Sequence, residues 1–265
     1  MKEFLGIGGY QRQPEGFLSW QHLTFVTTLM VLMVALAWLL GKKNRNSDYS
    51  VKNKVLIWAA ALIVGIDTFE IIFVCWRDSN PWAWLHLLPL FLCSMQAVAM
   101  PIAALAKGKV REASLDFVFV FGILGALLGT YGAGQNYNCY PVISFNNVVS
   151  GVTHSLAGFA SLYIAFSGMA SMKKENVGWC FGELVALSAV AYGVNHLIDY
   201  NYMFLMRGDG TPYDILYNLV GGSPVFYPLG VVGLFLIYIA AFYYVYYKIT
   251  HRKAKQAQAE QSVTA

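Results

Sequence analysis

The stretch HLTFVTTLMVLMVALAWLLG, residues 22–41, contains no charged residue and is apolar over most of its length. A helix of about 20 residues crosses the roughly 30 Å of hydrocarbon in a bilayer. In lipid, backbone polar groups must be hydrogen-bonded within the protein, and a helix achieves this within its own segment. The stretch therefore predicts a membrane-spanning helix, and the rest of the chain repeats its pattern.

The composition of the whole chain agrees with this interpretation. Hydrophobic residues make up 57% of the 265 residues and charged residues only 12%, and the mean hydropathy is +0.51. Soluble globular proteins contain about 25% charged residues. A chain this apolar cannot cover a water-facing surface, which excludes a soluble enzyme or a nucleic-acid-binding protein. We expect an all-α, polytopic membrane helix bundle.

Hydropathy divides the chain into seven apolar stretches with short polar connections between them. The predicted spans are residues 22–41, 53–76, 83–106, 114–132, 146–171, 178–203 and 224–248. They form one transmembrane domain, residues 1–249. A polar and basic tail follows at residues 250–265, and we expect it to be disordered in the cytoplasm.

Positive charge lies on alternate connections. The segments 42–54, 107–113 and 172–177, together with residues 248–255, hold nearly all of the 18 Lys and Arg residues. The exceptions are Lys2, Arg12, Arg77 and Arg207. Because cytoplasmic loops are enriched in Lys and Arg, we expect the N-terminus outside and the C-terminus in the cytoplasm, as an odd number of spans also requires.

Polar side chains from four predicted spans reach similar depths in the outer half of the membrane, at about 1.5 Å of rise per residue. Such residues are expensive in lipid and commonly mark function, although hydrogen bonds between helices are an alternative role. We expect them to meet in one polar cavity. They are Asp67, Glu70, Cys93, Gln96, His154, Asn195, His196 and Asp199. The remaining acidic residue assigned to a span, Glu183, lies near the cytoplasmic end, where its carboxylate can reach the headgroups.

Glycine, proline and cysteine residues add architectural expectations. Gly125 and Gly129 form a GxxxG pattern, which is typical of close helix packing. Pro89 lies four residues before Cys93 and can free backbone polar groups near the cavity. Cys75 and Cys139 both fall near the outer face, where a disulfide could form.

Several kinds of chemistry fit these residues. Cys93 and His154 could act as a nucleophile and base that attack an acyl carbonyl. A metal hydrolase using His154 and His196 lacks any diagnostic ligand spacing. A transporter is the main rival, because buried carboxylates and histidines also form proton or cation relays.

Three motifs resemble a known family. LPLFLCS, residues 88–94, is similar to the family pattern LPLHLCS, with Phe91 in place of the usual histidine. His154 is followed by a small residue, and NYMFL, residues 201–205, is nearly identical to its family counterpart. The chain thus resembles the bacterial YwaF-type integral membrane proteins, which are related to the eukaryotic transmembrane protein 164 family.

The resemblance implies a bundle of six or seven helices in a bacterial plasma membrane. The eukaryotic relatives are lipid acyltransferases that use a cysteine and a histidine. The histidine corresponds to His154, whereas Leu90 stands where those relatives have cysteine and Cys93 lies three residues later. We therefore expect Cys93 and His154 as catalytic residues and a lipid or other amphiphile as substrate, bound by the remaining polar residues. We expect neither a cofactor nor a bound metal ion. A transporter or a non-catalytic subunit of a membrane complex remains the alternative.

Overall fold

The computed structural model describes the backbone of residues 1–264 and the side chains of residues 1–250. The regular structure of this part is entirely helical. Its elements are α1 (Lys2–Leu5), α2 (Trp20–Asn44), α3 (Tyr49–Arg77), η1 (Ala83–His86), α4 (Gln96–Leu105), α5 (Gly108–Leu128), α6 (Gly134–Cys139), α7 (Phe145–Phe166), η2 (Lys174–Asn176), α8 (Val177–Ile198), η3 (Tyr202–Phe204), α9 (Tyr213–Leu219) and α10 (Phe226–Thr264). The side chains of the predicted disordered tail, residues 250–265, lie almost entirely outside the described residues.

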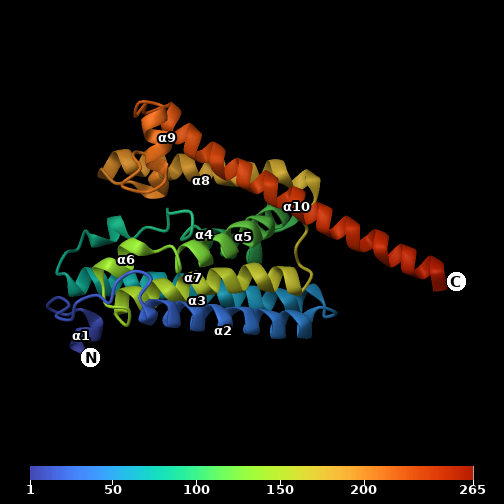
Figure 1. Ribbon diagram of the computed structural model, residues 1–265, viewed down its shortest axis with the longest axis horizontal. Coiled ribbons are helices and arrows are strands. Elements are labelled where there is room, and N and C mark those ends of the chain that lie inside the picture. The colour runs from blue at the N-terminus through green and yellow to red at the C-terminus, as the bar shows by residue number, and fades with distance from the viewer. Residues whose placement is uncertain (265) are drawn as a thin grey trace.

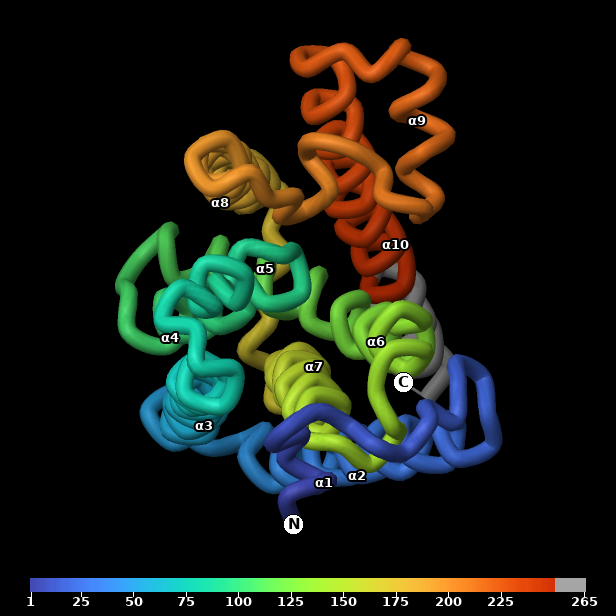
Figure 2. Tube along the Cα trace, turned by 90° about the vertical axis from the view of Figure 1, so that its left-hand side faces the viewer, coloured from blue at the N-terminus to red at the C-terminus, as the bar shows by residue number. Residues whose placement is uncertain are grey.

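The helices pack in layers around α5. Helix α7 packs against both α2 and α5, and α4 packs between α3 and α5. Helix α8 lies on the other side of α5 and contacts α10 (Figures 1 and 2). Because neighbours cover α5 on both sides, every residue from 113 to 122 is buried. Helix α5 is therefore the central helix of the bundle.

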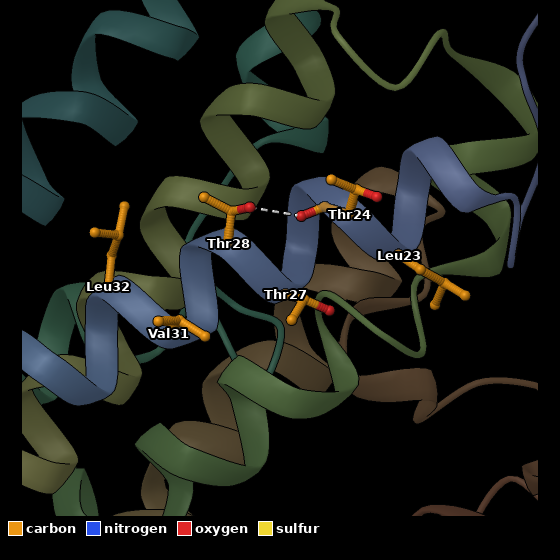
Figure 3. A pocket seen from close by; sticks show the side chains of 6 residues that line it. All are labelled: Leu23, Thr24, Thr27, Thr28, Val31 and Leu32. Atoms are coloured by element: carbon orange, nitrogen blue, oxygen red, sulfur yellow. Dashed lines mark hydrogen bonds between the residues drawn. The ribbon is translucent and has the colours of Figure 1, made fainter.

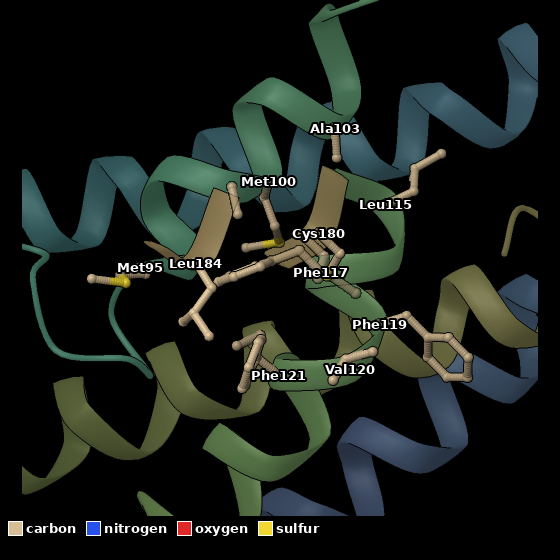
Figure 4. Close-up of a cluster of buried hydrophobic side chains, with 14 of the residues drawn as sticks. Met95, Met100, Ala103, Leu115, Phe117, Phe119, Val120, Phe121, Cys180 and Leu184 are labelled. Atoms are coloured by element: carbon tan, nitrogen blue, oxygen red, sulfur yellow. The ribbon is translucent and has the colours of Figure 1, made fainter. Parts of the chain in front are cut away.

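The main hydrophobic core joins α4, α5 and α8. Met100 of α4, Phe117 and Phe121 of α5, and Leu184 of α8 are all at most 1% exposed. Figure 4 shows their side chains gathered between these helices. This core holds α8 to the rest of the bundle.

The basic connections gather at one end of the molecule, which we call the basic end. Lys109 lies 3.3 Å from Glu175, which joins the start of α5 to η2. The Arg111 guanidinium lies 4.5 Å from the ring centroid of Tyr49 at the start of α3. Lys174 lies over the ring of Tyr247 in α10. The opposite end carries residues 1–19 and α6, where the Tyr10 hydroxyl donates to Asn146.

Among the described residues, five helices are long and apolar enough to cross a membrane. They are Trp20–Asn44, Tyr49–Arg77, Phe145–Phe166, Lys174–Ile198 and Phe226–Thr250. The chain is therefore a multi-pass membrane protein.

The predicted continuous helix at 83–106 is wrong. The chain forms the short η1, then an irregular segment at 87–95, and only then α4. Pro89 lacks an amide hydrogen and disfavours helical geometry in the residue before it. The Tyr202 hydroxyl accepts from the amide of Leu88 at 3.1 Å and donates to the carbonyl of Leu85 at 2.6 Å. A distant side chain therefore replaces the helical hydrogen bonds that this segment lacks.

A fifth acidic residue, Asp116, lies in a predicted span and was not among the candidate functional residues. It is fully buried near the basic end of α5. Its carboxylate accepts hydrogen bonds from the amide of Met172 at 2.9 Å, the side chain of Asn176 at 3.0 Å and the hydroxyl of Tyr243 at 2.7 Å. Asp116 thus ties α5 to the 167–176 connection and to α10.

Candidate active site: the Cys93–His154 pair

Cys93 and His154 meet although they are far apart in the sequence. Cys93 lies in the irregular segment just before α4, and His154 lies in the middle of α7. The Cys93 thiol and the His154 imidazole lie next to each other, close enough to interact. Both residues are only partly buried, so the pair borders an accessible surface of the protein.

The hydrogen bonds of His154 assign its ring nitrogens. Nδ1 lies 2.7 Å from the backbone carbonyl oxygen of Ser150, one helical turn earlier. A carbonyl can only accept, so Nδ1 carries the proton in the neutral ring and Nε2 carries the lone pair. This tautomer leaves Nε2 as the basic nitrogen, which is what a thiol nucleophile requires of its base.

Two glycines of α5 make room for the pair. A Cβ atom at Gly129 would overlap the His154 ring, and one at Gly125 would lie 3.4 Å from the Cβ of Cys93. The GxxxG pattern predicted close helix packing. Helix α5 does pack closely against α7, and Gly125 and Gly129 leave the space that the Cys93 and His154 side chains occupy.

Backbone amides also surround the Cys93 sulfur. The N–H groups of Cys93 and Ser94 lie close to it. Both belong to the turn that leads into α4, where amides have no partner earlier in the helix. Donors in this position stabilise a negative charge on sulfur, or on an oxygen that develops beside it.

The remaining cysteines differ from Cys93 in their surroundings. Cys75, Cys139 and Cys180 are free, so the disulfide considered between Cys75 and Cys139 is not formed. Cys180 is completely buried in the hydrophobic core, whereas Cys139 is exposed.

Two acidic residues of α3 flank the pair. Asp67 and Glu70 are both close enough to His154 to interact with its charge. Within the described part of the chain, neither carboxylate forms an ion pair with a basic side chain. The site therefore carries acidic groups that have no basic counterpart in direct contact.

Gln96 is an unsatisfied polar residue on the turn after Cys93. It is 0% exposed, and among the described atoms neither its amide nitrogen nor its amide oxygen has a hydrogen-bond partner. A buried polar group without a partner costs about 1–3 kcal/mol. Such a group at this position calls for an explanation beyond packing.

The predicted residues of α8 do not join this cluster. Asn195 is buried, and its amide is engaged by the backbone of Tyr202. His196 and Asp199 are exposed, and the ring of His196 packs edge-on against Tyr192. The expected cluster of polar side chains therefore comes from α3, α7 and the segment before α4, but not from α8. Similar depth did not imply the same side of the bundle.

Two surface grooves lie elsewhere. One, of about 510 Å³, is lined by residues of α2, including Leu23, Thr27 and Val31 (Figure 3). It contains no ionisable side chain. The other, of about 520 Å³, lies near the basic end, and there the Glu183 carboxylate accepts from the Ser114 hydroxyl at 3.2 Å. Neither groove includes Cys93 or His154.

A family model describes almost the whole chain. The model of the TMEM164 family matches residues 17–253, which include Cys93, His154 and the NYMFL motif. No curated protein and no solved structure gives a significant match. Since the matched region covers far more than half of the sequence, the chain belongs to the TMEM164 family.

Proposed function

We propose that the protein transfers acyl groups from membrane lipids, with Cys93 as the nucleophile and His154 as its base. The observation that carries the proposal is the close approach of the Cys93 thiol and the His154 ring. The apolar surroundings support it too, because a lipid ester can reach a partly exposed pair in a helix bundle from the bilayer.

In the first step, Nε2 of His154 takes the thiol proton and the Cys93 thiolate attacks the ester carbonyl carbon. The carbonyl oxygen gains negative charge, and the amides of Cys93 and Ser94 are the nearest donors to it. When the intermediate collapses, the C–O bond breaks and His154 returns the proton to the departing alkoxide. The acyl group is then held on Cys93 as a thioester.

In the second step, an acceptor hydroxyl or a water molecule attacks the thioester. His154 removes its proton, and the thiolate leaves and regains that proton from the imidazolium. We assign substrate binding to Gln96, Asp67 and Glu70, because Gln96 offers a free amide donor and the two acids face the same histidine. Of the predicted binding residues of α8, Asn195 has a different role, argued below, and the exposed His196 and Asp199 are left unassigned.

A direct test uses phosphatidylcholine that carries an alkyne-tagged palmitoyl chain, mixed with the purified protein in micelles. We expect a tagged protein band that hydroxylamine removes, as thioesters require. Cys93→Ala should abolish this band, and His154→Ala should lower its rate of formation by about 10²-fold or more. Cys139→Ala is the matched control and should leave the band unchanged. Equal labelling of wild type, Cys93→Ala and His154→Ala would refute the covalent mechanism.

We also propose seven crossings in a bacterial plasma membrane, with the N-terminus outside. The clustering of the basic connections at one end of the bundle supports this orientation. Helix α5 and the region 83–105 would supply the two crossings beyond the five long apolar helices. Irregular backbone at membrane depth is tolerated where protein encloses it, as α5, α7 and Tyr202 enclose segment 87–95. An impermeant maleimide should label the exposed Cys139 in intact cells, and labelling only after lysis would reverse the orientation.

A proton-coupled transporter is the second candidate. The specific observation in its favour is the pair Asp67 and Glu70, two acidic groups of a spanning helix with no ion-pair partner in the described part of the chain. Proteoliposomes loaded with a pH-sensitive dye would then show a proton flux that disappears in Asp67→Asn. A flux that is equal in both proteins, or absent from both, would exclude this reading.

A further inference from the structure

The NYMFL motif, residues 201–205, lies outside the proposed chemistry, yet it contacts the segment that carries Cys93. The Tyr202 ring is completely buried. Its hydroxyl bridges the carbonyl of Leu85 and the amide of Leu88. Leu85 lies in η1 and Leu88 lies in the irregular segment 87–95 that contains Cys93, so a single phenol bridges η1 and that segment.

A second contact acts two residues before Cys93. The Phe91 ring packs edge-on against Tyr202, with centroids 5.1 Å apart, and lies 6.0 Å from Phe204. Beyond Phe91, the Ser94 hydroxyl accepts from the Phe91 amide at 3.1 Å and so closes the turn that contains Cys93. The motif thus holds the segment both at its start and immediately before the nucleophile.

Helix α8 fixes Tyr202 in turn. The Asn195 side chain accepts from the Tyr202 amide at 2.7 Å and donates to its carbonyl at 3.0 Å. Met203 and Phe204 follow with φ angles of 55° and 57°, a conformation that is rare for bulky residues. Such backbone strain costs about 1–3 kcal/mol per residue and persists only where the surroundings over-determine it.

We infer that Tyr202, held by Asn195, is a positioning residue for Cys93. This inference rests on the proposed function. The hydroxyl sets the path of segment 87–95 so that the Cys93 thiol meets Nε2 of His154. Without it, the fold persists but the pair separates, and the thiol loses the base that deprotonates it. The strained backbone at Met203 and Phe204 is the energetic cost of placing Tyr202 in this position.

The test measures how fast a palmitoyl-chain chloroacetamide alkylates Cys93 as a function of pH. Tyr202→Phe keeps the ring and removes only the bridging hydroxyl. Tyr200→Phe is the matched control, because Tyr200 packs in the same aromatic group and its hydroxyl has no hydrogen-bond partner among the described residues. We expect Tyr202→Phe to react about tenfold or more slowly at neutral pH, in line with the steep dependence of reactivity on geometry. Its pH midpoint should move upward, and Tyr200→Phe should match wild type.

The outcomes separate this inference from the proposed function. If His154→Ala slows alkylation but Tyr202→Phe matches Tyr200→Phe in both rate and midpoint, the positioning role is overturned while the Cys–His pair stands. If His154→Ala does not change the alkylation rate either, both the proposed function and the positioning role are refuted. Should Tyr202→Phe give no folded protein, Asn195→Ala decides in its place, with the same slower rate and higher midpoint expected.

Discussion

The two ends of α5 hold polar groups in opposite ways. At the basic end, the Asp116 carboxylate accepts from two backbone amides, one side-chain amide and one hydroxyl. At the other end, Gln96 has no partner within the described part of the chain, and Asp67 and Glu70 have no basic side chain in contact. A buried carboxylate whose oxygens are hydrogen-bonded stabilises a fold, whereas a buried polar group without a partner destabilises it. We interpret the Asp116 end as serving stability and the Cys93 end as the proposed ligand site.

The largest effect that tests this contrast is expected for Asp116→Ala. The substitution leaves the amide of Met172, the side chain of Asn176 and the hydroxyl of Tyr243 without their acceptor. We expect a loss of several kcal/mol in the free energy of unfolding, because each buried donor left without its acceptor costs about 1–3 kcal/mol. A thermal melt of the detergent-solubilised protein would measure it. Asp116→Asn, which keeps one acceptor oxygen, should lose less.

Asp67→Asn is the counterpart at the other end. Because the Asp67 carboxylate lacks an ion-pair partner in the described structure, its removal should leave the melting temperature unchanged or raise it. If Asp67→Asn destabilised the protein as strongly as Asp116→Asn, the two ends of α5 would not differ in the way we describe.

The next prediction concerns the space that Gly129 leaves for the His154 ring. In Gly129→Ala the added methyl group would occupy the position of the His154 ring and displace it. We expect thioester formation to fall by about 10²-fold, the scale reported for ångström-sized misplacement. The matched control is Gly182→Ala in α8, where the new Cβ has open space around it and activity should persist. Full activity of Gly129→Ala would mean that His154 does not need its present position.

The sequence predicted those features that depend on neighbouring residues in the chain. It did not predict those that depend on contacts between distant residues. Hydropathy is a local property, and six of the seven predicted stretches form the helices α2, α3, α5, α7, α8 and α10, all of which except α5 are long and apolar enough to cross a membrane. The seventh failed because the backbone of segment 87–95 is satisfied by Tyr202, 114 residues further along the chain from Leu88. No local pattern encodes such a partner.

In the candidate site, too, local features were predicted and long-range contacts were not. Counting residues along a span gives depth, and depth correctly suggested that Cys93 and His154 could meet. Depth does not show which way a side chain points around the axis of its helix. Asn195, His196 and Asp199 were therefore assigned to a cluster that they do not join. Asp116 was missed although it stands alone among apolar neighbours, a signal that a count of span carboxylates could have found. The role of Gly129 could not be predicted, because it depends on which helix faces α5.

A smaller effect is expected for Gln96→Leu, and the direction of the change in stability is informative. The amide is buried and has no partner among the described atoms, so a leucine of similar size should raise the free energy of unfolding by about 1 kcal/mol. At the same time it removes a donor that we assign to the substrate, so thioester formation should slow. Melting temperature and labelling rate, measured on one preparation, would show both. A variant that is less stable and fully active would place Gln96 among the structural residues.

The smallest effect lies outside the membrane, in the segment that covers the end of the bundle nearest the site. Hydrogen bonds from the backbone amides of Arg12 and Gln11 hold the pKa of the Glu3 carboxyl below its usual range. A carboxyl whose pKa is lowered by folding stabilises the fold above its ordinary pKa, and this contribution disappears as the pH falls through the lowered value.

The amides of Gln11 and Arg12 should therefore lose protection from hydrogen exchange in acid, after correction for the intrinsic rates. In Glu3→Gln the protection should be weaker at neutral pH and nearly independent of pH. Identical pH profiles for the two proteins would show that the N-terminal turn is held by its neighbours Tyr10 and Asn146 rather than by this charge.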